Sequence, residues 1–240
     1  MTLRRFLLIA LPVAAFLLAL GGPGGGRLQA SHTPDHPNFS FPWPRQQAWF
    51  LTGGPHSALG SRVYGSGLDF APAPDAPQRP VVAMADGVVR FAGFLPWTGY
   101  GNVVAVDHGD GWEVWYAHLD RIAVWPGQLV LRGRYLGEAG NTGHSEGVHV
   151  HLELFRYGRR VPWSLVTIEG WHVHGVAEYA GFLQRDGVQV WSGDTRTGVP
   201  LASTSPLILA CSPLDGQVAV DLVYQSYVTG SGVPQPCPPP

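Results

Sequence analysis

A segment ending at residue 154 alternates apolar and polar side chains, and this period of two predicts a β-strand. The apolar members are Val148, Val150, Leu152 and Leu154, and the polar members are His149, His151 and Glu153. Because successive side chains of a strand point to opposite faces, the two imidazoles share one face. We therefore expect one face to pack in a core and the other to carry a polar site that suits one metal ion.

The rest of the chain favours an all-β fold. Its 240 residues include 32 Gly and 22 Pro, and no long stretch shows helical periodicity. Short apolar runs are separated by glycine and aspartate turns, which is typical of strands. Expected strands are residues 80–85, 87–92, 102–107, 112–118, 135–139, 170–176, 178–183, 188–191 and 218–228. Asp86-Gly87 predicts a tight hairpin between the first two, and residues 102–107 are expected to pair with 112–118.

The N-terminus has the pattern of an export signal. Arg4 and Arg5 precede an apolar run from Phe6 to Leu20, and small residues follow, so residues 1–30 read as a signal peptide. An uncleaved N-terminal anchor is the alternative. If the signal peptide is removed, we expect no membrane span in the remainder. We then expect a secreted or extracytoplasmic protein that is associated with the cell wall. The remainder carries 12 basic and 17 acidic residues, a net charge of −5, which argues against nucleic acid as a partner.

The mature chain is expected to have four parts. These are a leader segment (31–49), a main domain (50–163), a β-rich C-terminal extension of unassigned role (164–233) and a Pro-rich tail (234–240). Cys211 and Cys237 are the only cysteines of the chain. In an exported protein, two cysteines predict a disulfide bond.

Two His-x-His pairs occur, and their surroundings distinguish them. The second pair, His172 and His174, has no accompanying candidate ligands, whereas His118 ends a strand expected in the same sheet as the first pair. His56 and Asp69 lie upstream. A catalytic zinc site takes three protein ligands from histidine and carboxylate and leaves one position for water, which two histidines and one aspartate would satisfy.

The order and spacing of several motifs between about Thr52 and Phe155 resemble the lysostaphin-type zinc metalloendopeptidases of bacterial cell walls. The motifs are Gly99-Tyr100-Gly101-Asn102-Val103-Val104-Ala105-Val106-Asp107-His108-Gly109, Tyr116-Ala117-His118-Leu119, Gly127-Gln128-Leu129-Val130, Gly137-Glu138-Ala139-Gly140-Asn141-Thr142-Gly143 and Gly147-Val148-His149-Val150-His151-Leu152-Glu153. Most members carry the first ligand histidine four residues before the aspartate, where this chain has Gly65. His56, thirteen residues before Asp69, is similar to the arrangement of the branch that contains the LasA and β-lytic endopeptidases.

The resemblance implies a mostly antiparallel β-sheet with a zinc site in a groove over it. It implies that His56, Asp69 and His151 bind Zn²⁺ and that His118 and His149 flank the open position as catalytic residues. An imidazole there can take the proton of a zinc-activated water or stabilise the oxyanion. Which of the two is the general base stays open. Glu153 is either a partner that orients a ligand imidazole or a solvated edge residue.

The implied function is a secreted zinc metalloendopeptidase that hydrolyses stem or cross-bridge peptides of peptidoglycan. Two alternatives remain at this point: a non-catalytic wall-binding or regulatory module of the same fold, and a general secreted protease acting on other peptide substrates. The expected partner is peptidoglycan or another peptide substrate, and the chain is expected to be a monomer.

Overall fold

A computed structural model describes residues 35–57, 63–193, 195 and 198–208. The expected signal peptide, the Cys211–Cys237 disulfide, the strand at 218–228 and the Pro-rich tail lie outside these residues. Among the described residues, no helix has the length and apolar character needed to cross a membrane.

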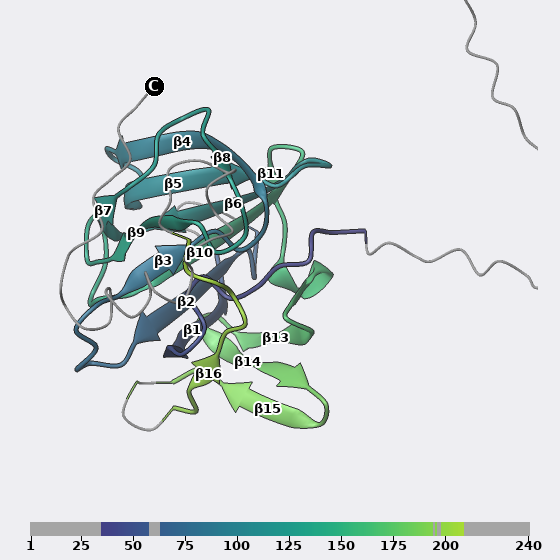
Figure 1. The fold of residues 1–240 in the computed structure, drawn as a ribbon. Coiled ribbons are helices and arrows are strands. Elements are labelled where there is room, and N and C mark those ends of the chain that lie inside the picture. The colour runs from purple at the N-terminus through teal and green to yellow at the C-terminus, as the bar shows by residue number, and fades with distance from the viewer. Residues whose placement is uncertain (1–34, 58–62, 194, 196–197, 209–240) are drawn as a thin grey trace, which may run out of the picture. The chain divides into compact units, whose positions relative to one another are not determined.

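The largest element is an antiparallel sheet of nine strands (Figure 1), in the order β16-β1-β2-β10-β6-β5-β4-β8, with β11 paired to β10. Its strands are β1 (Ala48–His56), β2 (Gly67–Pro72), β4 (Gly87–Leu95), β5 (Gly101–Asp107), β6 (Trp112–Ala117), β8 (Leu129–Val130), β10 (Val150–Arg156), β11 (Arg159–Arg160) and β16 (Leu201–Ala202). The pairing expected between residues 102–107 and 112–118 is confirmed, because Val104 of β5 lies opposite Tyr116 of β6.

Two smaller antiparallel sheets complete the described fold. One joins β3 (Pro80–Val82), β9 (Tyr135–Ala139) and β7 (Leu119–Ile122), and the other joins β12 (Thr167–Ile168), β13 (Trp171–Ala177), β14 (Ala180–Arg185) and β15 (Val188–Trp191). A single short 3-10 helix, η1 (Trp163–Leu165), is the one helical element in the described part of the chain. The all-β expectation is confirmed.

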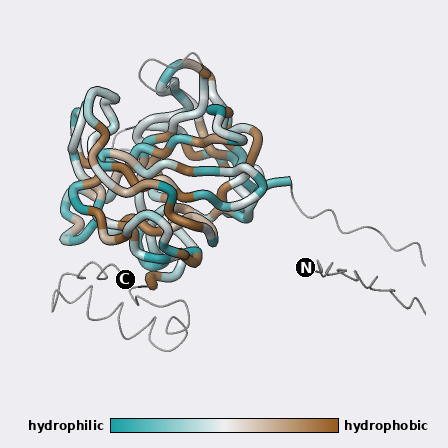
Figure 2. The backbone as a smooth tube through the Cα atoms, turned by 90° about the horizontal axis from the view of Figure 1, so that it is seen from above, coloured by the Kyte–Doolittle hydropathy of each residue, from teal (hydrophilic) through white to brown (hydrophobic). Residues whose placement is uncertain are grey.

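The core lies against one face of the large sheet. Val150, Leu152 and Leu154 of β10 are all fully buried there, as the alternation predicts. Val148 is an exception: it is 37% exposed, because β10 begins only at Val150. Figure 2 shows hydrophobic segments along the strands and hydrophilic ones in many of the connecting turns.

Residues 35–47 of the leader segment contribute to this core. Their backbone is mostly irregular, but Phe39, Phe41 and Trp43 are buried. The Trp43 ring stacks on Phe41 at 4.6 Å between centroids and on Trp49 of β1 at 5.3 Å. Residues 39–43 therefore cover an apolar surface of the main domain.

The hairpin expected at Asp86-Gly87 is wrong. β3 pairs with β9, and β4 pairs with β5 and β8, so the two segments belong to different sheets. The amides at the end of β3 are already engaged, since Val82 N donates to Pro42 O and Ala83 N donates to Arg134 O. The chain at Asp86-Gly87 therefore crosses from one sheet to the other.

Candidate metal centre

One row of residues across four strands organises the site. Gly53 of β1 pairs with Asp69 of β2, Asp69 pairs with His151 of β10, and His151 pairs with Ala117 of β6. Cross-strand partners point to the same face of a sheet. The carboxylate and the imidazole therefore meet on the face opposite the core, and His118 follows directly after Ala117.

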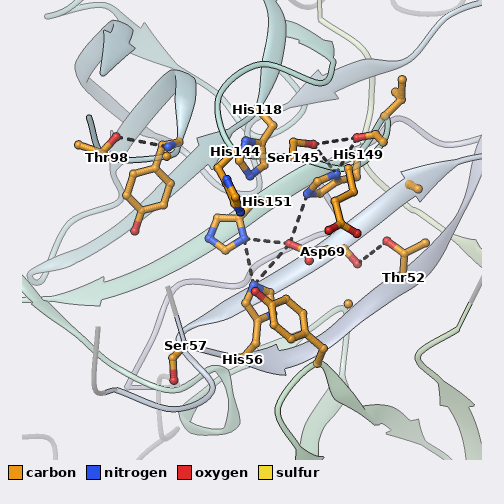
Figure 3. Close-up of a pocket in the computed structure, with 18 residues that line it drawn as sticks. Thr52, His56, Ser57, Asp69, Thr98, His118, His144, Ser145, His149 and His151 are labelled. Atoms are coloured by element: carbon orange, nitrogen blue, oxygen red, sulfur yellow. Dashed lines mark hydrogen bonds and ion pairs between the residues drawn. The ribbon is translucent and has the colours of Figure 1, made fainter. Parts of the chain in front are cut away.

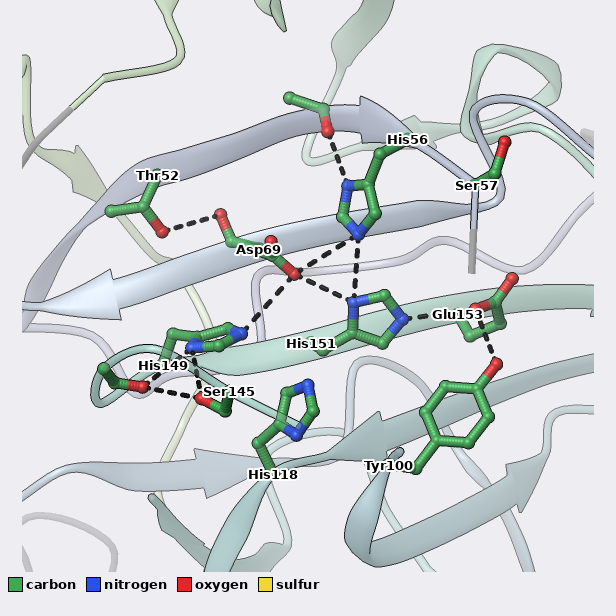
Figure 4. A network of polar contacts seen from close by, with 12 residues as sticks. Thr52, His56, Ser57, Asp69, Tyr100, His118, Ser145, His149, His151 and Glu153 are labelled. Atoms are coloured by element: carbon green, nitrogen blue, oxygen red, sulfur yellow. Dashed lines mark hydrogen bonds and ion pairs between the residues drawn. The ribbon is translucent and has the colours of Figure 1, made fainter. Parts of the chain in front are cut away.

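Three of the expected site residues bring one electron-pair donor each to the same point (Figure 4). His151 Nδ1 lies 2.8 Å from Asp69 Oδ1 and 3.2 Å from His56 Nε2. His56 Nε2 lies 3.6 Å from Asp69 Oδ1. His56, which lacks the usual spacing to Asp69 in sequence, is thus placed beside the aspartate and the second histidine of the pair.

The outward nitrogens of the two imidazoles are held by acceptors. His56 Nδ1 donates to Gly54 O at 2.8 Å, and His151 Nε2 donates to the Glu153 carboxylate at 3.2 Å. A carbonyl or a carboxylate only accepts hydrogen bonds, so in neutral imidazoles the inward nitrogens carry lone pairs. Two nitrogen lone pairs and a carboxylate oxygen then converge, a donor set that fits Zn²⁺.

The electrostatics of the three groups keep a negative charge at this point. Burial lowers the pKa of His151, but its hydrogen bonds with Asp69 and Glu153 outweigh burial and raise the pKa to about 9. Burial raises the pKa of Asp69, yet the hydrogen bond and charge of His151 hold it below its ordinary value. Desolvation holds the pKa of His56 below its ordinary value. The site thus retains a carboxylate, and a cation at its centre is stabilised by it.

A glycine beneath the imidazoles makes room for them. Gly67 of β2 pairs with His56 on one side and Glu153 on the other. A Cβ built on Gly67 would lie 2.7 Å from His56 Nε2 and 2.8 Å from His151 Cε1. Gly67 is not among the site residues predicted from the sequence. The available signal is a glycine inside a strand, which often marks a close approach of other atoms to the backbone.

The two expected catalytic histidines border the same point. His118 Nδ1 donates to Thr142 O at 2.8 Å, and His149 Nδ1 donates to Gly147 O at 2.9 Å, so each ring carries its Nε2 away from the backbone. The two ring centroids lie 4.8 Å apart, and His149 Nε2 is 3.7 Å from Asp69 Oδ1. His149 precedes β10 in an isolated bridge to Gly140.

The backbone at His118 is unusual. His118 has a φ of 60°, the left-handed region that non-glycine residues rarely adopt, and its N–H donates to Tyr100 O. Such a conformation costs of order 1–3 kcal/mol and persists where surrounding contacts enforce it. Here it turns the imidazole from the end of β6 over the row of site residues.

Glu153 is a buried partner of His151 and not a solvated edge residue. Its side chain is fully buried. Tyr100 Oη donates to Glu153 Oε2 at 2.9 Å, and Arg160 Nε lies 3.3 Å from Oε1. Burial raises the pKa of Tyr100 to about 12, so the phenol keeps the proton that it donates. Glu153 therefore fixes which nitrogen of His151 faces the metal position.

Glu153→Gln is expected to weaken zinc binding about tenfold, in line with the effect of altered partners of ligand histidines. The amide oxygen of glutamine can still accept from His151 Nε2, but the negative charge that makes the imidazole more basic is lost. Competition with a chromogenic chelator measures the affinity. Arg159→Gln is a matched control, since it removes an exposed charge elsewhere. Unchanged affinity in Glu153→Gln would contradict the role of the carboxylate.

The second His-x-His pair forms no such site. His172 and His174 are exposed on β13, and His174 stacks on Phe182 of the neighbouring strand at 4.7 Å between centroids. Their surroundings, not their spacing, distinguish the two pairs, as expected.

The metal position opens into a pocket of about 640 Å³ (Figure 3). The five expected site residues line it together with Thr52, Gly53, Ser57, Ala71, Thr98, Gly99, Tyr100, His144, Ser145, Glu146, Gly147, Val148 and Tyr179. Tyr179 comes from the C-terminal extension, for which the sequence pattern predicts no role.

The central segment of the chain is similar to proteins of a known family. Residues 64–162 match the family model described as peptidase family M23. The chain is 43% identical over 82 residues to the peptidoglycan DD-endopeptidase ShyA of Vibrio cholerae, covering 34% of this chain and 19% of the relative. It is 44% identical over 97 residues to the DD-carboxypeptidase/endopeptidase Mpg of Neisseria meningitidis, covering 40% and 21%. The chain thus spans about a fifth of these relatives.

A solved structure shares the fold. The deep-sea M23 metalloprotease pseudoalterin aligns with a TM-score of 0.57 and 24% identity, covering 69% of this chain and 98% of its own. The resemblance inferred from the motifs is confirmed. Asp69, His118, His149 and His151 lie inside the segment matched by the family model, whereas His56 and Tyr179 lie outside it.

Proposed function

Because residues 64–162 match the model of peptidase family M23, we propose that this chain is a zinc metalloendopeptidase that cleaves peptide bonds in peptidoglycan. The observation that carries the proposal is the convergence of His56 Nε2, Asp69 Oδ1 and His151 Nδ1 beside two further histidines. The names of the relatives ShyA and Mpg support the substrate class. The pattern of residues 1–30 supports action outside the cytoplasm.

His56, Asp69 and His151 would hold the metal. Zn²⁺ bound there supplies a lowered pKa for a water ligand and a Lewis acid for the scissile carbonyl. Glu153 and Gly54 O orient the ligand imidazoles by their hydrogen bonds.

His118 is assigned as the proton acceptor. Burial, followed by the neighbouring His149 and His151, lowers its pKa to about 4, so the ring is neutral near pH 7. Thr142 O accepts from its Nδ1, which leaves the lone pair on Nε2. A neutral imidazole with this lone pair can take a proton from an attacking water and pass it to the leaving amine.

His149 is assigned to the substrate oxygen. Gly147 O holds its Nδ1, and its Nε2 lies near Asp69 Oδ1, on the pocket side of the ring. In its protonated form, Nε2–H can donate to the oxygen on which negative charge develops, the usual task of an oxyanion-stabilising donor.

Hydrolysis of purified peptidoglycan tests the function. We expect the zinc-loaded chain to release free amines from sacculi and to lose this activity when a chelator removes the metal. Parallel assays with casein and with pentaglycine separate a general protease from a wall enzyme. Zinc binding without hydrolysis of any of the three substrates would favour a non-catalytic wall module instead.

Zinc affinity is expected to rise with pH by about tenfold per unit between roughly pH 6 and 8. His151 has a pKa of about 9 in the metal-free protein, so it is protonated through this range and must lose that proton before Nδ1 can bind a metal ion. The affinity should level off above about pH 9. Calorimetry in two buffers of different ionisation enthalpy counts the protons released. Zinc binding at neutral pH with no proton release would contradict the assignment of His151.

A further inference from the structure

The C-terminal extension reaches the metal site through the turn between β13 and β14. Tyr179, at this turn, stacks its ring on the His56 imidazole, with 4.2 Å between centroids and 16° between planes. Tyr179 also lines the pocket, and the residue is 55% exposed. A residue 123 positions away in sequence thus contacts the first ligand directly.

The backbone of the same turn holds the strand end that carries His56. Gly54 N donates to Tyr179 O at 2.9 Å, while Gly54 O accepts from His56 Nδ1. On the other side of the ligand, Ser57 N donates to the Glu178 carboxylate. His56 is therefore flanked by two amides that are both bound to the Glu178-Tyr179 turn.

Glycines allow this turn to approach β1 closely. A Cβ on Gly54 would lie 2.6 Å from the Gly181 nitrogen, and a Cβ on Gly181 would lie 2.6 Å from Pro55 Cδ. Gly181 N is in turn bound by Ser192 Oγ at 3.1 Å. Because no side chain stands between the two glycines, the turn packs closely against the strand end that carries His56.

Tyr64 binds the same turn from a second direction. Its hydroxyl donates to Ala177 O at 2.9 Å, and its ring end lies over Gly175, where a Cβ would collide with it. Tyr64 stands at the start of the segment matched by the family model. Contacts from both sides of the site therefore keep Tyr179 against His56.

We propose that Tyr179 is a positioning residue that holds His56 in its metal-binding orientation, so that the C-terminal extension is part of the metal site. This inference rests on the proposed function, because it assigns His56 as a ligand. A histidine ring rotates freely about its outer side-chain torsion unless its faces are packed. The tyrosine ring restricts that rotation, and Gly54 O selects the orientation in which Nε2 faces Asp69 and His151.

Zinc affinity of two substitutions in the full chain tests the proposal. Tyr179→Ala removes the stacked ring and is expected to lower zinc affinity about tenfold or more, as the loss of an outer partner of a ligand does. Tyr179→Phe keeps the ring and is expected to retain the wild-type value. Trp191→Ala is the matched control, since it removes an exposed aromatic ring of the same sheet that packs on Phe182.

Thermal unfolding of the metal-free proteins separates positioning from a general effect on stability. Tyr179→Ala and Trp191→Ala should unfold at similar temperatures, although only Tyr179→Ala loses zinc affinity. Cobalt substitution gives an independent signature: the visible absorption bands of the Co²⁺ form should shift in Tyr179→Ala and remain unchanged in Tyr179→Phe.

Wild-type affinity in Tyr179→Ala, or an equal loss in Trp191→Ala, would overturn the proposal. These outcomes differ from a failure of the proposed function, in which the wild-type chain itself would bind no zinc or hydrolyse no peptide.

Discussion

His151→Ala is expected to abolish zinc binding and peptide hydrolysis together. Its Nδ1 is the donor closest to both other ligand atoms, 2.8 Å from Asp69 Oδ1 and 3.2 Å from His56 Nε2. Removing it leaves two ligands, fewer than the three that a catalytic zinc site needs. Metal content after dialysis against micromolar zinc and hydrolysis of sacculi are measured on the same preparation.

The variant should remain folded, since Glu153 keeps its contacts with Tyr100 and Arg160 when the imidazole is gone. His118→Ala is the comparison variant, because it separates the loss of a catalytic residue from the loss of a metal ligand. His118 is not among the three converging ligand atoms, so this variant should retain zinc while its kcat falls about 100- to 10,000-fold. Equal loss of zinc in both variants would contradict the division into ligands and catalytic residues.

Gly67→Ala is expected to lower zinc affinity about 100-fold with little change in thermal stability. The added methyl group would lie 2.7 Å from His56 Nε2 and 2.8 Å from His151 Cε1, well inside contact distance. The two imidazoles must therefore separate, and small displacements of a preorganised site are costly. Chelator competition measures the affinity, and circular dichroism on heating measures the stability.

Gly147→Ala provides the matched control. Gly147 also lines the pocket, but a Cβ there meets no atom within 4 Å, and its carbonyl oxygen still accepts from His149. Near-wild-type zinc affinity is expected for this variant. A Gly67→Ala protein that binds zinc as tightly as the Gly147→Ala protein would show that the site does not require a glycine at position 67.

Local patterns predicted the parts of the site that depend on side-chain alternation. The period of two predicted that Leu152 and Leu154 lie in the core and that His151 lies on the opposite face. This prediction needs only local information, because successive side chains of any strand point to opposite faces. The same reasoning failed at Val148, where the strand had not yet begun. Strand boundaries depend on pairing partners and are not encoded in the alternation.

Features that arise from strand pairing were beyond the sequence pattern. The Asp86-Gly87 dipeptide fits a tight hairpin. The amides at the end of β3 instead donate hydrogen bonds to Pro42 O and Arg134 O, so they do not pair with β4. The role of Gly67 follows from its register with His56 and Glu153, which no local motif shows. Tyr179 reaches His56 only through the packing of β14 on β1.

The assignment of His56 came from the resemblance to a family and not from periodicity or composition. His56 lacks the usual spacing to Asp69, with Gly65 at the expected position, and was assigned by similarity to one branch of the family. The structure brings its Nε2 within 3.6 Å of Asp69 Oδ1. The burial of Glu153 likewise distinguishes between two roles that the sequence left equally open.

A crystal structure of the zinc-loaded chain, with an anomalous difference map at the zinc absorption edge, tests the central claim most directly. We expect one strong peak about 2.0–2.2 Å from His56 Nε2, an Asp69 carboxylate oxygen and His151 Nδ1, with His118 and His149 beside a non-protein fourth ligand. A peak bound through His118 or His149 in place of His56, or no peak among these side chains, would contradict it.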